Sequence, residues 1–87
     1  MTGVPATRAQ WRAWVRSVNP GEVRRRAGVR QGELAGRIGA SSGLSVTAAA
    51  LGGWERGCGL PGDSAHRAAW YEAVTAMAAA VPARGTS

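Results

Sequence analysis

Apolar residues along this chain recur at intervals of three and four, the period of an α-helix, and no stretch alternates in the manner of a strand. Between residues 6 and 18 the positions Trp11, Trp14, Val15 and Val18 fall on one face of such a helix. The pattern therefore predicts an amphipathic helix at the start of the chain.

Asparagine, proline and glycine residues mark the bounds of the second predicted helix. Pro20 pushes Asn19 out of the helical region, which ends the first helix there. The same Asn19 can cap a new helix that has Pro20 at its first position and Glu22 at its third. We expect this helix to span residues 20–27, with Gly28 as a stop residue able to adopt positive φ.

Two further helices are predicted in the middle of the chain. Residues 31–38 carry a small apolar stripe, and Gly39 closes this helix. A polar loop follows at residues 40–45, in which Ser45 is a good cap for a helix over residues 46–54.

The last helix begins at Asp63 or Ser64 and runs to about residue 80, and the tail at 81–87 is expected to be disordered. The fold class is therefore an all-α bundle of about five short helices. The apolar stripe of the last helix consists of Ala69, Trp70, Ala73, Val74 and Met77.

The charge balance favours a polyanionic partner. Eleven arginines and no lysine face five acidic residues, which gives a net charge of +6 and an isoelectric point near 11.6. A GC-rich genome is the alternative explanation for abundant arginine, but it does not account for the shortage of acids.

Several kinds of chemistry lack the residues they need. Cys58 and His66 each stand alone, so neither an internal disulfide nor a zinc site is expected, and His66 is interpreted as a helix-surface residue. Neither a catalytic motif nor a cofactor or small-molecule site is recognisable. Without a secretory signal or a membrane-spanning apolar tract, the chain is expected to be cytoplasmic.

A run of motif residues resembles the Cro and phage-repressor family of helix–turn–helix proteins. The matching residues are Val23-Arg24, Ala27-Gly28-Val29, Gln31, Glu33-Leu34-Ala35, Ile38-Gly39, Trp54-Glu55-Arg56-Gly57 and Pro61. The resemblance covers about half the chain and implies two helices joined by a tight turn, the second of which enters the DNA major groove. The domain it implies covers residues 19–80 with the C-terminal helix, preceded by the N-terminal helix within residues 1–18.

The resemblance also implies roles for individual residues. Gln31 would contact a DNA phosphate at the start of the first helix of the motif, the alternative being an ordinary exposed residue. Arg24 and Glu55 would form an ion pair, the alternative being two separately solvated charges. Trp54 would belong to the core.

One departure weakens the case for base recognition. Gln31 and Trp54 are 23 positions apart, about six more than in the family, which predicts an enlarged turn. With Leu51 buried, few of the residues that would face DNA can donate a hydrogen bond to a base. The residues that would face DNA are Thr47, Ala48, Ala49, Ala50, Gly52 and Gly53.

Two functions remain open. The first is a double-stranded DNA-binding transcriptional regulator of bacterial or phage type, a repressor for example, that binds mainly through phosphates. Its contacts would come from Arg26, Arg30, Arg37 and Arg56, with Ser41 and Ser42 in the enlarged turn. The second is a protein-interaction module, such as an antitoxin or a host-factor-binding phage protein, on a repurposed helix–turn–helix.

The two ends of the chain leave alternatives as well. Arg8, Arg12 and Arg16 share one face of the first helix and either contact phosphates or are simply solvated. The aromatic residues either meet in the core or form a homodimer interface through the C-terminal helix. The aromatics are Trp11, Trp14, Trp70 and Tyr71, and the dimer candidates are Tyr71, Val74 and Met77.

Overall fold

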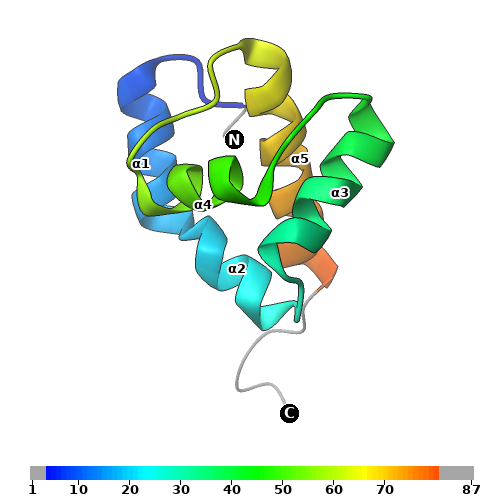
Figure 1. Ribbon diagram of the computed structural model, residues 1–87. Coiled ribbons are helices and arrows are strands. Elements are labelled where there is room, and N and C mark those ends of the chain that lie inside the picture. The colour runs from blue at the N-terminus through cyan, green and yellow to red at the C-terminus, as the bar shows by residue number, and fades with distance from the viewer. Residues whose placement is uncertain (1–3, 81–87) are drawn as a thin grey trace.

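Helices account for most of the chain, and the all-α prediction is confirmed. The structure, a computed structural model, describes residues 4–80, and no strand occurs among them. The predicted tail at 81–87 lies outside the described residues. The helices are α1 (Arg8–Val18), α2 (Pro20–Arg26), α3 (Gln31–Ser42), α4 (Ala48–Arg56) and α5 (Ser64–Ala80) (Figure 1).

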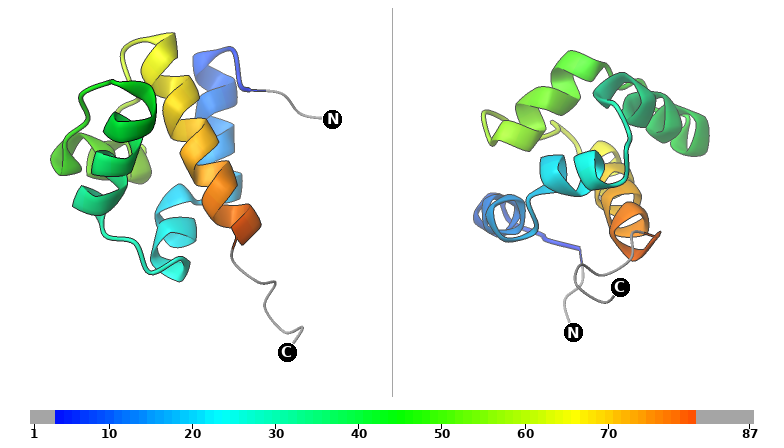
Figure 2. Two further views of the ribbon diagram at one scale, coloured as in Figure 1. Left: turned by 90° about the vertical axis from the view of Figure 1, so that its right-hand side faces the viewer. Right: turned by 90° about the horizontal axis from the view of Figure 1, so that it is seen from below.

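The helices lie in two groups on either side of α2. Seen from below, α3 and α4 occupy one side of the molecule, α1 and α5 occupy the other, and α2 lies between them (Figure 2). Helix α3 packs mainly on α4, and α2 packs on α5. The two helices of the predicted motif therefore form one outer layer of the bundle.

Local capping explains where α1 and α2 begin. The Thr7 side chain accepts a hydrogen bond from the Gln10 backbone N–H at 3.1 Å, and Gln10 Oε1 accepts one from the Thr7 N–H at 3.1 Å. Asn19 adopts a left-handed conformation (φ 56°) that ends α1, and its side chain accepts from the Glu22 N–H at the start of α2. The predicted Asn19-Pro20 junction is present.

The junction between α3 and α4 differs from the prediction. Helix α3 continues past Gly39 to Ser42, and it is followed by the cap residue Gly43, whose φ of 76° lies in the left-handed region that favours glycine. Helix α4 is capped by Thr47, which accepts from the Ala50 N–H at 3.1 Å, and the predicted cap Ser45 lies two residues earlier in the loop. The extra residues of the motif thus form an additional helical turn and a loop at 43–47.

An aromatic cluster joins the two ends of the bundle. Trp70 is fully buried, stacks on Trp11 at a centroid distance of 6.2 Å, and contacts Trp14 edge-on at 5.1 Å. Trp54 packs against Trp70 at 5.4 Å and is half-buried. The aromatics therefore meet within one molecule, which is the first of the two alternatives for these residues.

Two residues proposed for a dimer interface belong to this core instead. Val74 and Met77 are only 1% and 6% exposed because they face the other helices of the same chain. Tyr71 is half-buried and lies 5.5 Å from Trp14. Val74 and Met77, two of the three candidates for a homodimer interface, therefore belong to the core of one molecule, and a homodimer through α5 stays a prediction.

Candidate nucleic-acid interface

A buried ion pair fixes α4 relative to α2. Arg24 Nε lies 2.6 Å from Glu55 Oε2, Arg24 Nη2 donates to Glu55 Oε1 at 3.1 Å, and Arg24 Nη1 donates to the Val29 carbonyl at 2.8 Å. The two side chains are only 9% and 6% exposed. The predicted pair is therefore present, and its paired, bidentate geometry holds α4 in one orientation.

Gln31 extends this network to α3. Its Nε2 donates to Glu55 Oε1 at 3.2 Å. A Cβ added at Gly52 would lie 3.0 Å from Gln31 Nε2 and 3.4 Å from Arg56 Nη1, so the glycine provides the space in which both side chains cross α4. Gly52 is consequently buried, and the expectation that it faces a ligand was wrong.

The exposed face of α4 is formed by Thr47, Ala48, Ala49, Gly53 and Arg56, called here the α4 surface. Ala48 and Ala49 are exposed, whereas Leu51 on the opposite side of the helix is completely buried. The face carries small side chains and a single charge, the Arg56 guanidinium. Such a face allows close approach of another molecule but offers few hydrogen-bond donors.

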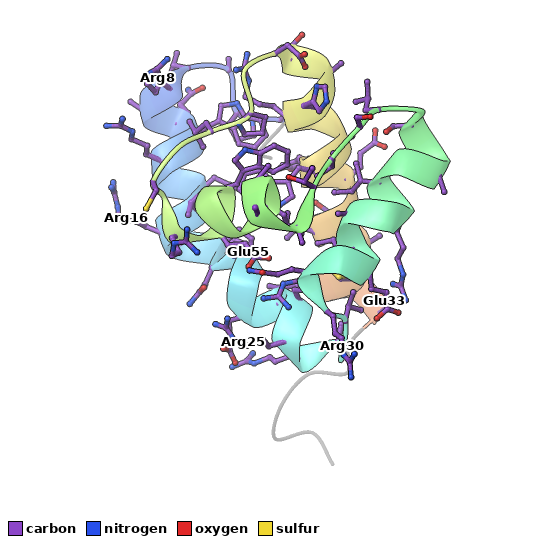
Figure 3. The ribbon with its side chains drawn as sticks, viewed as in Figure 1. Arg8, Arg16, Arg25, Arg30, Glu33 and Glu55 are labelled. Atoms are coloured by element: carbon purple, nitrogen blue, oxygen red, sulfur yellow. The ribbon has the colours of Figure 1, made fainter. Side chains whose placement is uncertain are left out.

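Two arginines lie at ends of the motif helices, one before α3 and one in the last turn of α4. Arg30 precedes α3 and projects from the lower end of the molecule, and Arg56 lies in the last turn of α4 (Figure 3). Neither guanidinium has an acidic partner within residues 4–80. Gln31, whose Nε2 lies beside Gly52 of α4, retains a second amide N–H besides the one it donates to Glu55.

Three other predicted contacts lie elsewhere. Arg26 and Arg37, together with Ser41, line a groove between α2, α3 and α5 that contains no α4 residue. Each arginine also pairs at 3.3 Å with a glutamate four residues earlier on its own helix. The structure therefore separates these residues from the α4 surface, because the helical phases of α2 and α3 turn them toward the groove beside α5.

The serines of the expected turn are in the last turn of α3. Ser41 and Ser42 are exposed, and both hydroxyls donate to the Ile38 carbonyl of the same helix. This pattern is the usual local bonding of a serine near a helix end. Neither hydroxyl is therefore presented by a loop, as had been expected.

His66 holds the α3–α4 loop in place. Its Nε2 lies 3.2 Å from the Ser45 carbonyl, and its Nδ1 lies 2.8 Å from Asp63 Oδ1. Asp63 also accepts from the His66 backbone N–H at 2.8 Å and thereby caps α5. His66 is thus a bridge between α5 and the loop that precedes α4, which the interpretation as a simple surface residue missed.

The hydrogen bonds of this bridge shift the pKa values of His66 and Asp63. The Asp63 side-chain bond raises the pKa of His66, and the bond to the Ser45 carbonyl acts in the same direction. The bond from the His66 backbone N–H, followed by that from its ring, lowers the pKa of Asp63. Because protonated imidazole donates from both nitrogens, only the cation satisfies both partners at once.

This bridge predicts a pH dependence of stability. The contribution of His66 is complete below its unfolded-state pKa of 6.5 and is lost as the pH rises through the higher folded-state value, while that of Asp63 is lost as the pH falls through its lowered value. NMR titration should give His66 a pKa above 6.5, and Asp63→Asn should lower it. A wild-type value at or below 6.5 would contradict the bridge.

Comparison with known proteins identifies no relative: no protein family, curated protein or solved structure compared with the chain matches it. In the described part of the chain, no helix has the length and apolarity needed to cross a membrane. Residues 4–80 also contain no group of three His, Cys, Asp or Glu side chains placed to hold a metal ion. The geometry of the α4 surface is therefore the main guide to function.

Proposed function

We propose that this chain is a double-stranded DNA-binding protein that inserts α4 into the major groove and acts as a transcriptional regulator in a bacterial or phage-infected cytoplasm. The observation that carries the proposal is the exposed, acid-free α4 surface, held rigidly by Arg24, Glu55 and Gln31 beside the start of α3. Helix–turn–helix proteins have this arrangement: a first helix, a short connection, and a second helix that the first one braces and that enters the major groove.

The side chains of the α4 surface favour phosphate contacts over base recognition. The side chains of Ala48 and Ala49 cannot donate to base edges, whereas Arg56 in the last turn of α4 and Arg30 before α3 have no acidic partner among residues 4–80. Small residues let the helix backbone come close to the groove, and the arginines then neutralise phosphates. We infer a binding mode with a strong salt dependence and a modest sequence preference.

A negative charge placed on the α4 surface should weaken this binding. Ala49→Glu puts a carboxylate at the second position of α4, where it is favourable for the helix but faces the phosphates of a docked duplex. We expect duplex affinity to fall at least about tenfold, because juxtaposed like charges cost more than about 1.4 kcal/mol. Fluorescence anisotropy with labelled duplex at about 50 and about 200 mM salt measures both the loss and the wild-type salt slope.

A matched variant controls for net charge and helix position. Ala65→Glu makes the same substitution at the second position of α5, where Ala65 is exposed and outside the α4 surface. It should retain most of the duplex affinity, and both variants should unfold at the wild-type urea concentration or above. Equal losses in the two variants would show that α4 is not the contact.

A protein partner is the second candidate, because an alanine- and glycine-rich helix face is also suited to close packing of another helix. In that case wild-type protein would show no duplex affinity even at low salt. The antitoxin-like or host-factor-binding function would then be the better proposal for the same α4 surface.

A further inference from the structure

A cavity of about 390 Å³ lies between α1 and the loop that connects α4 to α5. Three arginines line it, Arg8 and Arg12 from α1 and Arg67 from α5, and no Asp or Glu does. Only part of this charge was anticipated, because the sequence pointed to the arginine face of α1 but not to Arg67 or to the loop. The α1 side of the cavity lies outside the segment that resembles the Cro and phage-repressor family.

The three guanidinium groups are available to an anion. Arg8 and Arg12 are one helical turn apart, are exposed, and have no acidic partner within residues 4–80. Arg67 Nη1 donates to the Pro61 carbonyl at 3.0 Å, which orients its guanidinium while leaving other N–H groups free. Three arginines around one cavity that no carboxylate lines attract an anion, although water also solvates the exposed Arg8 and Arg12.

The loop adds backbone donors to the same cavity. Gly57 ends α4 in the left-handed conformation, and the Cys58 N–H donates to the Gly53 carbonyl at 3.0 Å, so the loop leads directly from the α4 surface. Among residues 4–80, the N–H groups of Gly59 and Leu60 have no hydrogen-bond acceptor. Glycines without side chains let an anion reach such N–H groups.

We propose that this cavity is a phosphate-binding site that holds a backbone phosphate of the duplex while α4 occupies the major groove. The inference rests on the proposed function. A helix in the groove has a sugar–phosphate backbone on either side, and α4 lies between the Arg30 end of the molecule and the arginines of α1 (Figure 3). Arg30 would therefore serve one strand, and the cavity the other.

Salt dependence tests the site through its charge. The double variant Arg8→Gln/Arg12→Gln should make the slope of log affinity against log salt shallower by about 1, since the site holds one phosphate and each phosphate contact contributes about 0.9. The control Arg16→Gln/Arg25→Gln removes the same charge from exposed positions that do not line the cavity. It should change the slope by clearly less.

Cys58 provides a second readout inside the cavity. The thiol is exposed and lies among the lining residues, so a bound phosphate should shield it from iodoacetamide. Saturating duplex should slow alkylation of the wild type and of the control at least about threefold, and should not slow that of Arg8→Gln/Arg12→Gln. Comparing each variant with and without duplex removes differences in intrinsic thiol reactivity.

The two readouts separate this site from the proposed function. Duplex binding with an unchanged slope and an unshielded Cys58 overturns the site and leaves the function of α4 intact. If duplex does not bind at all, the same alkylation assay with pyrophosphate decides: shielding lost in Arg8→Gln/Arg12→Gln supports a phosphate site that serves a free ligand, and no shielding overturns it.

Discussion

Glu55→Ala should lower the free energy of unfolding by about 3 to 5 kcal/mol, as is typical when one partner of a buried ion pair is removed. Arg24 is only 7% exposed and would keep its charge without a counterion. The Gln31 amide would also lose its acceptor. Urea denaturation followed by far-ultraviolet circular dichroism measures the change. A loss of less than about 1 kcal/mol would mean that water solvates Arg24 in the variant.

Two control variants identify the unpaired charge as the cause. Arg24→Met/Glu55→Met removes both charges and should be more stable than Glu55→Ala, because apolar pairs often replace buried ion pairs at little cost. Glu33→Gln breaks the exposed pair with Arg37, whose side chains are 50% and 57% exposed, and should change stability by less than about 1 kcal/mol.

Trp70→Ala should have a comparable effect, a loss of about 3 to 5 kcal/mol, because it opens a large cavity at the centre of the bundle. Trp70 is fully buried and touches Trp11, Trp14 and Trp54, which come from α1 and α4. The loss is a large share of the about 5 to 15 kcal/mol that stabilises a typical domain. Thermal unfolding monitored by circular dichroism should therefore show a strongly lowered midpoint or no folded baseline.

A surface substitution separates this effect from a general loss of apolar side chains. Val18 ends α1 and is 36% exposed, and Val18→Ala should change the free energy of unfolding by less than about 1 kcal/mol. If Trp70→Ala cost no more than Val18→Ala, the aromatic cluster would not be the centre of the core.

Helix boundaries were predicted correctly where a capping side chain marks them, and incorrectly at the end of α3. Asn19 and Asp63 are recognisable because their side chains bond backbone groups three residues away. Gly39 was read as a helix stop, yet it lies inside α3, where an added Cβ would be 3.2 Å from the Leu44 carbonyl. A glycine that permits close approach and a glycine that ends a helix look the same in the sequence.

The candidate site was partly predictable for a similar reason. The Arg24–Glu55 pair followed from the family resemblance, because it depends on two positions within the motif. Arg26 and Arg37 were assigned to DNA from charge alone, whereas the phase of their helices places them on the groove toward α5. Arg67 was missed because only the path of the α4–α5 loop brings it to the arginines of α1.

The position of Trp70 late in the sequence has a consequence for synthesis. The ribosome makes α1 first, but the indole that Trp11 and Trp14 pack against comes from α5. At about 5 to 20 residues per second, the two early indoles wait roughly 3 to 12 seconds for their partner. The nascent protein therefore carries unpaired aromatic side chains during elongation, and it completes its folding only after the final helix has been translated.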